Sequence, residues 1–359
     1  MLERCVGAQA VVLRAYFTVR AQGICALRAK SISIALLLSH AVAITGVRLT
    51  RSTILVFGAG GQLGRELCGD ASGDFTIRGA TRADADITDD EAIRKAIDLA
   101  APCLVVNAAG YTHVDRAEAE VEQAFDANAT GPGVIARACR RASVPLIHIS
   151  TDYVFDGSKQ TAYTESDPIA PVGAYGRSKA AGEMAVRDAL PRHVILRTSW
   201  IYGVHGQNFA KTMVRLAAER DELRIVHDQR GCPTGSADVA GAILAIARRL
   251  AASASPWGTY HFAGVGATTW YEFAREIVNA QAEFTHHVPT VVPITTAQFG
   301  APARRPANSE LDCARFAATF GFRATAWRER TRQVVAALLG STPAGAPGAA
   351  RSVAGHLVR

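Results

Sequence analysis

A glycine-rich turn between a short apolar strand and a helix constrains this chain more than any other feature. The run 53–57 is apolar and has the length of a buried strand. Three glycines with regular spacing follow it at once, Gly58, Gly61 and Gly64. Glycine allows a tight turn and close approach of the backbone to a pyrophosphate, and the N-terminus of the next helix then faces the negative charge. An ordinary glycine-rich turn is the alternative, but the strand before it and the helix after it favour dinucleotide binding.

After this turn, apolar runs alternate with amphipathic segments as far as residue 200. Strands are predicted at 75–80, 103–106, 144–149 and 193–197, and helices at 89–99, 116–126, 130–142 and 175–190. Such alternation is typical of a doubly wound parallel sheet, so we predict an α/β Rossmann-type fold over 53–340. Beyond Trp200 the segments are more irregular. We expect the residues after 200 to build most of a smaller C-terminal substrate-binding lobe.

Candidate catalytic groups are predicted at the carboxyl ends of these strands. Tyr175 and Lys179 are four residues apart and therefore lie one turn apart on one face of a helix. Thr151 and Asp152 follow the apolar run 144–149. Ligands of open α/β sheets bind beyond the carboxyl ends of the strands, so these groups should converge on one crevice. A tyrosine–lysine pair alone could be a surface pair; with the glycine turn as context, it suits proton delivery to a carbonyl oxygen.

The charge distribution argues against nucleic acid as a partner. The whole chain carries a net charge of +7, but residues 1–52 hold seven basic side chains against one acid, and residues 341–359 add two arginines. The body 53–340 is left with a net charge of −1, which gives no basic footprint for nucleic acid. The seven cysteines form no C-x-x-C pair and no metal-binding spacing, as expected for reduced cysteines in a cytoplasmic protein.

Both ends of the chain are predicted to lie outside the fold. Residues 31–47 are largely apolar but include several polar residues, and they are shorter than a comfortable membrane span. As a signal peptide, the segment would be too long and its basic region too far from the start. We favour a third explanation, in which residues 1–50 are an N-terminal extension and translation starts at Val47. Residues 341–359, rich in alanine, glycine and proline, are predicted to be a disordered tail.

Together, these motifs resemble the dTDP-4-dehydrorhamnose reductase family of the extended short-chain dehydrogenase/reductase superfamily. The superfamily resemblance rests on the glycine turn, Asn107-Ala-Ala109, the stretch 150–157 and Tyr175-x-x-x-Lys179. The closer resemblance rests on Val114-Asp-Arg-Ala-Glu118, Arg197-Thr-Ser-Trp-Ile-Tyr202, Asn208-Phe-Ala-Lys-Thr-Met213, Asp228-Gln-Arg-Gly-Cys-Pro-Thr234, Thr269-Trp-Tyr271 and Ala303-Arg-Arg-Pro306. It covers residues 53–340 and does not extend to either end of the chain.

The resemblance implies an oxidoreductase that acts on a nucleotide sugar. The implied reaction reduces the C4 ketone of dTDP-4-dehydro-L-rhamnose to dTDP-L-rhamnose, the last step in making this precursor of cell-wall and O-antigen polysaccharides. By the same resemblance, Tyr175 donates the proton, Lys179 holds the nicotinamide ribose and lowers the pKa of the phenol, and Thr151 hydrogen-bonds the ketone oxygen. A free tyrosine has a pKa of about 10, so a nearby cation is needed for acid–base chemistry near neutrality.

The resemblance also implies two sets of binding residues. The cofactor-binding set is Gly58, Gly61, Gln62, Leu63, Gly64, Arg82, Asp86, Ile87, Ala108, Ala109, Tyr175 and Lys179. The substrate-binding set is Thr151, Asp152, Trp200, Asn208, Lys211 and Arg305. Alternatives stay open for four of them: Trp200 could belong to the core, Asp152 could cap a turn, and Lys211 and Arg305 could be solvated surface residues.

The end of the second predicted strand bears on the choice of cofactor. NAD-specific folds usually place an acid there to bind the ribose 2′-hydroxyl. Here the stretch reads Gly79-Ala-Thr-Arg82, with no acid before Asp84. We therefore expect NADPH to be preferred, with NADH also usable.

Magnesium is not expected to be needed. Some reductases of this family hold Mg²⁺ between two subunits through three glutamates. Glu66 and Glu219 match two of those positions, but the third falls near Ala337, where there is no carboxylate. Because Mg²⁺ prefers several hard oxygen ligands, we predict activity without added Mg²⁺ and a monomer or weak homodimer.

Two other functions compete with ketone reduction. A dehydratase or epimerase of the same superfamily is one, but a dehydratase typically needs Thr-Asp-Glu, and here Tyr153 follows Thr151 and Asp152. The other is a non-catalytic NADP-binding regulatory subunit, similar to the one that associates with methionine adenosyltransferase. The intact set of Thr151, Tyr175 and Lys179 argues against it.

Overall fold

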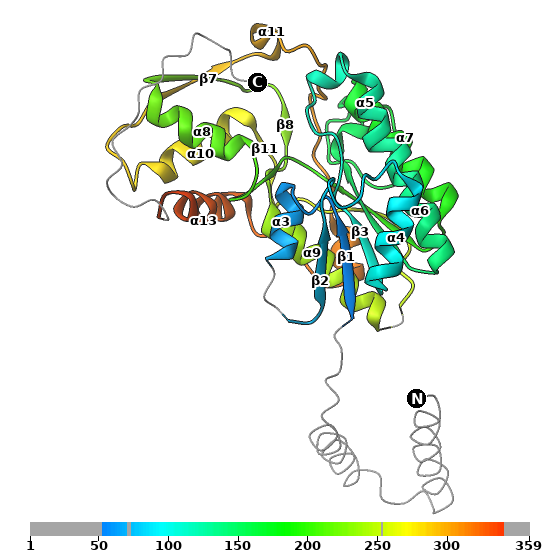
Figure 1. The fold of residues 1–359 in the computed structure, drawn as a ribbon. Coiled ribbons are helices and arrows are strands. Elements are labelled where there is room, and N and C mark those ends of the chain that lie inside the picture. Colours follow the sequence, from blue (N-terminus) through cyan, green and yellow to red (C-terminus); the bar gives the residue numbers. More distant parts are fainter. Residues whose placement is uncertain (1–51, 70–72, 253, 341–359) are drawn as a thin grey trace, which may run out of the picture. The chain divides into compact units, whose positions relative to one another are not determined.

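A parallel sheet of six strands forms the centre of the computed structural model, which describes residues 52–69, 73–252 and 254–340 (Figure 1). The predictions for residues 1–50 and 341–359 fall outside the described residues. Across the sheet the order is β2-β1-β3-β4-β5-β10, and every neighbouring pair is parallel. In chain order the strands are β1 (Thr53–Phe57), β2 (Thr76–Ala80), β3 (Leu104–Asn107), β4 (Leu146–Thr151), β5 (His193–Thr198) and β10 (Gly258–His261). The predicted Rossmann-type α/β class is confirmed.

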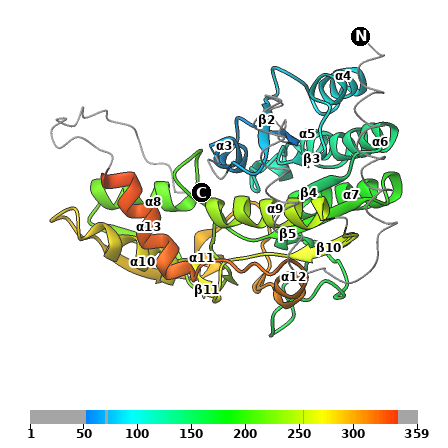
Figure 2. The same ribbon diagram turned by 90° about the horizontal axis from the view of Figure 1, so that it is seen from below.

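The four inner strands β1, β3, β4 and β5 are buried along almost their whole length, because both faces of the sheet are covered. In β1, Ile54 and Val56 pack into one core cluster, whereas Leu55 and Phe57 pack into another. The first cluster is covered by α3 (Gln62–Cys68), α9 (Ser236–Ala251) and α12 (Ala314–Phe320). The second is covered by α4 (Asp90–Ala100), α6 (Gly131–Ala142) and α7 (Ala174–Ala189). Figure 2 shows the two groups of helices on opposite sides of the sheet.

Two local predictions differ from the structure. Strand β4 continues to Thr151, so Thr151 is the last residue of the strand and does not follow it. The segment predicted as a helix over 116–126 is broken into a 3-10 turn (Arg116–Glu118), α5 (Val121–Phe125) and a π-helical turn (Asp126–Thr130). The π turn carries Asn128, whose amide donates to the carbonyl of Tyr111 at 3.0 Å and to Ser178 at 3.0 Å. These tertiary bonds favour the wider turn, and local helix propensity does not reveal them.

A second group of elements lies beside the sheet and has its own core (Figure 1). It consists of α8 (Phe209–Glu219), β7 (Glu222–Val226), α10 (Trp270–Gln281), β12 (Thr290–Ile294) and α13 (Trp327–Gly340). We call this group the lobe. Strands β7 and β12 pair in parallel. Between lobe elements the chain returns to the sheet, because α9, β10 and α12 all pack there.

Short connecting elements are β6 (Ile201–Tyr202), β8 (Arg230–Gly231), β9 (Thr234–Gly235), β11 (Thr268–Thr269), α11 (Thr296–Phe299) and a 3-10 turn (Asp152–Val154).

Helix α7 is fixed on the sheet by a buried ion pair. Glu183 is fully buried and accepts two hydrogen bonds from Arg197 of β5, from Nε at 2.8 Å and from Nη2 at 2.8 Å. It also accepts from Ser150 Oγ of β4 at 2.6 Å and from Arg187 Nη2 at 2.7 Å. Since Glu183 lies on the same face of α7 as Tyr175 and bonds residues of two strands, these bonds set the position of the helix on β4 and β5.

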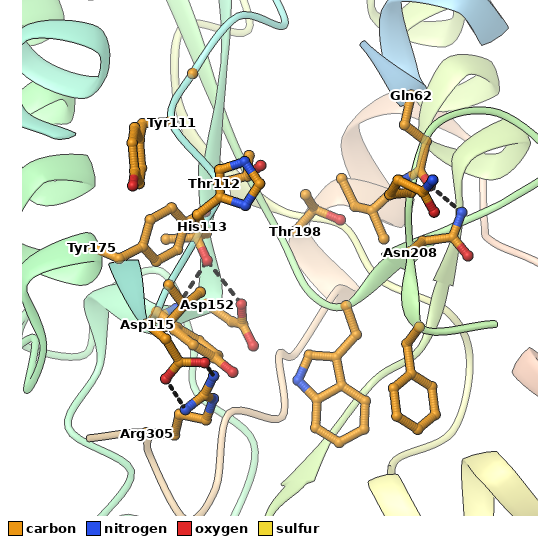
Figure 3. Close-up of a pocket in the computed structure, with 18 of the residues that line it drawn as sticks. Gln62, Tyr111, Thr112, His113, Asp115, Asp152, Tyr175, Thr198, Asn208 and Arg305 are labelled. Atoms are coloured by element: carbon orange, nitrogen blue, oxygen red, sulfur yellow. Dashed lines mark hydrogen bonds and ion pairs between the residues drawn. The ribbon is translucent and has the colours of Figure 1, made fainter. Parts of the chain in front are cut away.

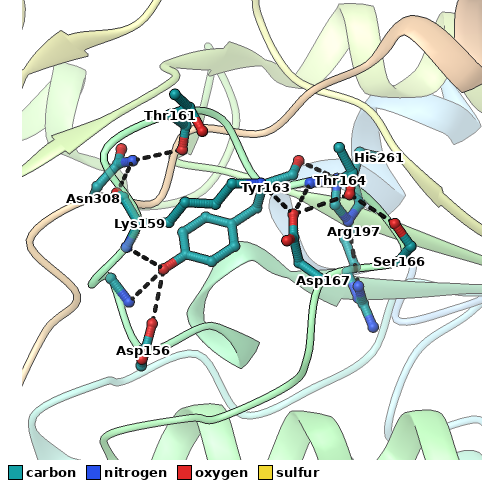
Figure 4. A network of polar contacts seen from close by, with 11 residues as sticks. Asp156, Lys159, Thr161, Tyr163, Thr164, Ser166, Asp167, Arg197, His261 and Asn308 are labelled. Atoms are coloured by element: carbon teal, nitrogen blue, oxygen red, sulfur yellow. Dashed lines mark hydrogen bonds and ion pairs between the residues drawn. The ribbon is translucent and has the colours of Figure 1, made fainter.

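A polar network ties the segment 303–309 to the loop that follows β4 (Figure 4). Tyr163 Oη donates to Asp156 at 2.8 Å and accepts from the backbone of Lys159 at 3.1 Å. Asn308 Nδ2 donates to the carbonyl of Lys159 at 2.8 Å and to that of Thr161 at 3.0 Å. The network therefore fixes the segment that carries Arg305 and Ser309.

Within the described ranges, no helix has both the length and the apolar character that a membrane span requires.

We predict that Glu183→Gln destabilises the fold strongly. The variant keeps the shape of the side chain but leaves Arg197, which is 2% exposed, without its counter-charge. Removing one partner of a buried pair costs about 3–5 kcal/mol, so the free energy of unfolding from urea denaturation should fall by that order. The control is Glu219→Gln in an exposed pair, in which Arg215 Nη1 is 2.7 Å from Glu219; it should cost about 1 kcal/mol or less. Equal losses in the two variants would contradict the role of Glu183.

The same pair gives the stability a definite dependence on pH. Burial by itself raises the pKa of Glu183, but the hydrogen bonds and charge of Arg197, with help from Ser150 and Arg187, outweigh burial and lower the pKa to about 2. A folded-state pKa below the unfolded value of about 4.3 means that the stabilisation is complete above that value and is lost as the pH falls toward 2. The Glu183→Gln variant should lack this acid-induced loss.

Candidate active site

A cavity of about 910 Å³ opens at the carboxyl ends of β1, β3 and β4. The order of the strands reverses between β1 and β3, which is where open α/β sheets bind ligands. The walls come from the glycine turn, the loop after β3, the end of β4, the start of α7 and parts of the lobe. In Figure 3, Asp152 and the pair of Asp115 and Arg305 lie toward one side, and Gln62 and Asn208 lie toward the other.

The glycine turn packs too tightly for any side chain at its first and last glycines. Gly58 has φ +85°, and a Cβ there would lie 2.5 Å from the backbone nitrogen of Ala109. A Cβ on Gly64 would lie 2.2 Å from the carbonyl oxygen of Gly58. Gly61, the residue before α3, offers no side-chain cap, and the first turn of α3 has no acid. Residues 61–63 form part of the cavity wall, so the unbonded N–H groups expected at this end of α3 lie beside the cavity and suit a phosphate.

The predicted cofactor residues divide into two groups. Gly61, Gln62, Leu63, Ala108, Ala109, Tyr175 and Lys179 line the cavity, and Gly58 and Gly64 form the turn behind it. Arg82, Asp86 and Ile87 lie outside the cavity wall. The side chain of Arg82 is 90% exposed, and its Nε is 3.1 Å from Asp86 Oδ2. Arg82 can therefore meet only the part of a ligand that extends outward past the end of β2.

The three predicted catalytic residues meet at one end of the cavity. Lys179 is buried, and its ammonium donates to the carbonyl of Ile149 at 2.6 Å. Burial lowers the pKa of Lys179 to about 8. Burial raises the pKa of Tyr175 to about 12, against which its hydrogen bond with Thr151 acts. In this arrangement Lys179 bonds a backbone carbonyl and not the phenol, so its lowering of the pKa of Tyr175 stays a prediction.

Asp152 is nearly sealed from solvent beside these residues. It is 2% exposed, accepts from Thr151 Oγ1 at 2.9 Å and accepts from Ser199 Oγ at 2.9 Å. Burial raises the pKa of Asp152 to about 6, although hydrogen bonds from Ser309, Ser199 and Thr151 act in the opposite direction. Each carboxylate oxygen can accept a further hydrogen bond, and Asp152 belongs to the cavity wall, so its contact with a sugar stays a prediction.

Trp200 was predicted either to bind the substrate or to belong to the core, and its position fits both. It lines the cavity and also stacks on Trp270 of α10, with ring centroids 3.5 Å apart and planes 9° apart. Its backbone has φ +46°, which an L-residue other than glycine rarely adopts. Gly231 makes the close packing possible, because a Cβ there would lie 2.5 Å from the indole ring.

The other predicted substrate residues differ in where they point. Asn208 lines the cavity and caps α8. Its Nδ2 also donates to Gln62 Oε1 at 2.7 Å, and this hydrogen bond joins the lobe to the glycine turn. Arg305 lines the cavity, but its guanidinium bonds both carboxylate oxygens of Asp115, at 2.9 and 2.8 Å. Lys211 is not part of the cavity wall, and its ammonium donates to the carbonyl of Val204 at 3.3 Å.

Several residues of the cavity wall were not predicted from the sequence. The largest group is the loop after β3, which includes Tyr111, His113 and Asp115. The rule that ligands bind beyond the carboxyl ends of parallel strands could have found this loop, since it follows β3 directly. Tyr153 and the lobe residue Trp270 also line the cavity. Tyr153 follows β4 directly, so the same rule could have found it. No local pattern indicates Trp270, because its position depends on the packing of the lobe.

The two glutamates considered for Mg²⁺ have partners within the protein. Glu66 accepts from Ser236 Oγ at 2.7 Å, and Glu219 pairs with Arg215 at 2.7 Å. Over the part of the chain that the structure describes, no group of three or more His, Cys, Asp or Glu side chains is placed to hold a metal ion.

Comparison with known proteins assigns the chain to a family. The family model described as RmlD substrate binding domain matches residues 52–339. The dTDP-4-dehydrorhamnose reductase of Sinorhizobium fredii is 44% identical over 288 residues, which cover 80% of this chain and 97% of that protein. The chain belongs to the dTDP-4-dehydrorhamnose reductase family. The dTDP-4-dehydrorhamnose reductase of Aggregatibacter actinomycetemcomitans is 40% identical over 286 residues, 78% of this chain and 97% of that protein.

Solved structures from this family share the fold. A dTDP-4-dehydrorhamnose reductase from Clostridium acetobutylicum has a TM-score of 0.74 and 36% identity, and the match covers 80% of this chain and 99% of that chain. The enzyme from Bacillus anthracis, solved in complex with NADP, has a TM-score of 0.73 and 34% identity, covering 79% of this chain and 98% of that chain. The family consists of NAD(P)H-dependent oxidoreductases, as the sequence motifs indicated.

We predict that Asn208 holds the lobe against the glycine turn through its side-chain amide. Asn208→Ala loses both the cap of α8 and the bond to Gln62, and loss of a cap costs about 1 kcal/mol of stability. Asn208→Ser keeps an oxygen that can cap the helix but cannot reach Gln62. Stability from urea denaturation should therefore fall in Asn208→Ala and be largely restored in Asn208→Ser, whereas amide hydrogen exchange at 62–64 should become faster in both. Unchanged exchange in both variants would show that the bond to Gln62 does not hold the turn.

Proposed function

We propose that this protein reduces the C4 ketone of dTDP-4-dehydro-L-rhamnose to dTDP-L-rhamnose with NADPH. The observation that carries the proposal is the convergence of Tyr175, Thr151 and Lys179 on a cavity whose other end is the glycine turn. Family membership supports it, because relatives named dTDP-4-dehydrorhamnose reductase match over almost their whole length. The NADP complex of the Bacillus anthracis enzyme supports the choice of cofactor.

The residues of this chain fit a dinucleotide. The N–H groups at the start of α3 would hold the diphosphate, and the small side chains of Ala108 and Ala109 leave space beside the backbone. Lys179 would hold the ribose next to the nicotinamide. The bound cofactor supplies the reducing equivalent that the carbonyl carbon needs. Arg82, at the outer end of β2, would meet a 2′-phosphate.

Tyr175 is well suited to act as the acid. With a pKa of about 12 it is fully protonated at neutral pH, so its proton is available. An acid this weak gives up its proton only to a strongly basic oxygen, and the ketone oxygen becomes one as reduction proceeds. The phenolate that remains needs a nearby cation. Lys179, with a pKa of about 8, is cationic at pH 7 and lies one turn away on α7.

The substrate is expected between this end of the cavity and the lobe. We propose that Trp200, Asn208 and Arg305 meet the nucleotide sugar, since all three line the cavity. Lys211 would need a different side-chain conformation to do so, because its ammonium bonds the carbonyl of Val204. We further propose that the protein acts in the cytoplasm as a monomer or weak homodimer.

The central test of this proposal is Tyr175→Phe, which keeps the ring but removes the acid. General acid–base catalysis contributes about 10²–10⁴-fold, so kcat for reduction of dTDP-4-dehydrorhamnose should fall by that order with a smaller change in KM. The thermal midpoint and the binding of NADPH should hardly change. Tyr271→Phe is the matched control, because Tyr271 lies outside the cavity wall. Near-normal turnover of Tyr175→Phe would refute the mechanism and favour a non-catalytic binding role.

A second test concerns the choice between NADPH and NADH. A hydrogen bond to a charged group is worth about 1.5–3 kcal/mol, so Arg82→Ala should raise the KM for NADPH about tenfold or more. The KM for NADH should change little, because NADH has no 2′-phosphate. Arg94→Ala, which removes an exposed arginine of α4, serves as the control. If Arg82→Ala leaves both KM values unchanged, Arg82 does not contact the cofactor.

A further inference from the structure

The hydroxyl of Thr151 has a single proton, and the groups around it determine where that proton can go. Oγ1 of Thr151 accepts from the backbone N–H of Tyr153 at 3.2 Å and lies 2.9 Å from Asp152 Oδ1. An ionised carboxylate can only accept hydrogen bonds, so Thr151 must donate its proton to ionised Asp152. In that state Thr151 has one lone pair left and can only accept from Tyr175 or from a substrate.

This arrangement conflicts with what the reduction needs. A ketone oxygen only accepts hydrogen bonds, and so does the phenolate that Tyr175 becomes after it gives up its proton. Thr151 can donate to either of them only when its bond with Asp152 runs in the opposite direction. A protonated Asp152 would donate to Thr151 Oγ1, and the proton of Thr151 would then be free to turn toward the cavity.

The surroundings of Asp152 allow this change. In the described chain, the side chains that donate hydrogen bonds to Asp152 include no lysine or arginine. The donors are the hydroxyls of Thr151, Ser199 and Ser309. Asp115, which also lines the cavity, differs in this respect, because it pairs with Arg305 through two hydrogen bonds. With only neutral donors, burial dominates and raises the pKa of Asp152 to about 6.

Other titratable groups near Asp152 change their charge at higher pH. Burial raises the pKa of Tyr153, and it raises those of Tyr175 and Cys232 to about 12. Lys179 on α7 loses its proton near pH 8, and Arg305, which bonds Tyr153, stays charged. Among the groups that face Asp152 from these elements, the carboxyl of Asp152 is therefore the one that titrates near pH 6.

We propose that Asp152 is a positioning residue that sets the direction of the Thr151 hydroxyl. Protonated Asp152 frees the Thr151 proton for the ketone oxygen and so favours reduction, whereas ionised Asp152 makes Thr151 an acceptor for the product hydroxyl. The proton transferred to the substrate still comes from Tyr175, which regains it from solvent, and the proton of Asp152 is not consumed. The inference rests on the proposed function.

The first test is the pH profile of ketone reduction between pH 5 and pH 8. In the wild type, kcat should fall as the pH rises through about 6, approaching about tenfold per pH unit. Asp152→Asn cannot titrate, so this limb should disappear. Ser199→Ala removes a donor that stabilises the ionised carboxylate, so the limb should move to higher pH. A merely structural role for Asp152 would lower the rate at every pH in both variants and leave the limb in place, which would overturn the proposal.

A second readout does not depend on turnover. The infrared signal of a protonated carboxyl in the ligand-free protein should titrate near pH 6, be absent in Asp152→Asn and shift to higher pH in Thr151→Val, which removes one donor. Its absence from the wild type above pH 5 would overturn the proposal. A wild-type protein that reduces no dTDP-4-dehydrorhamnose at any pH refutes the proposed function. Reduction with the same limb in wild type and Asp152→Asn refutes only the role of Asp152.

Discussion

The buried ion pair of Glu183 and Arg197 is the interaction on which the geometry of the candidate site depends. Removing both charges from water costs several kcal/mol per ion, so the pair is not a simple source of stability. What it provides is position, since its bidentate geometry fixes α7 against β5, and Ser150 adds a bond to β4. Tyr175, Lys179 and Glu183 recur every four residues on α7, and holding the last of them therefore places the other two.

The site then follows from how charge is distributed around that helix. Charges that hold the fold together are paired, as in Glu183 with Arg197. At the reacting end, Lys179 and Asp152 are buried with only neutral hydrogen-bond partners, and both pKa values move toward neutrality from opposite sides. A fold that pairs its structural charges and leaves its reactive groups with neutral partners can stay stable while keeping groups that titrate near pH 7.

The sequence predicted those features that are local in the chain. The glycine turn predicted one end of the cavity, and the alternation of apolar and amphipathic segments predicted the parallel sheet. Tyr175 and Lys179 were found because their spacing matches one helical turn. The partners that position them were not found, because Glu183 and Arg197, or Asp152 and Ser199, are brought together by strand order and not by spacing. The π turn at Asn128 escaped prediction for the same reason: its bonds to Tyr111 and Ser178 come from distant parts of the chain.

Arg305 has a role within the fold as well as its proposed contact with the substrate. The family resemblance implies that Arg305 binds the substrate. In the structure the guanidinium of Arg305 is already neutralised by Asp115, so an anionic ligand must compete with a bidentate carboxylate for it. The same pair anchors the segment 303–309, whose Ser309 bonds Asp152. A change at Arg305 would therefore alter the carboxyl that directs Thr151 as well as any contact with substrate, and a loss of activity on its own cannot be assigned to lost binding.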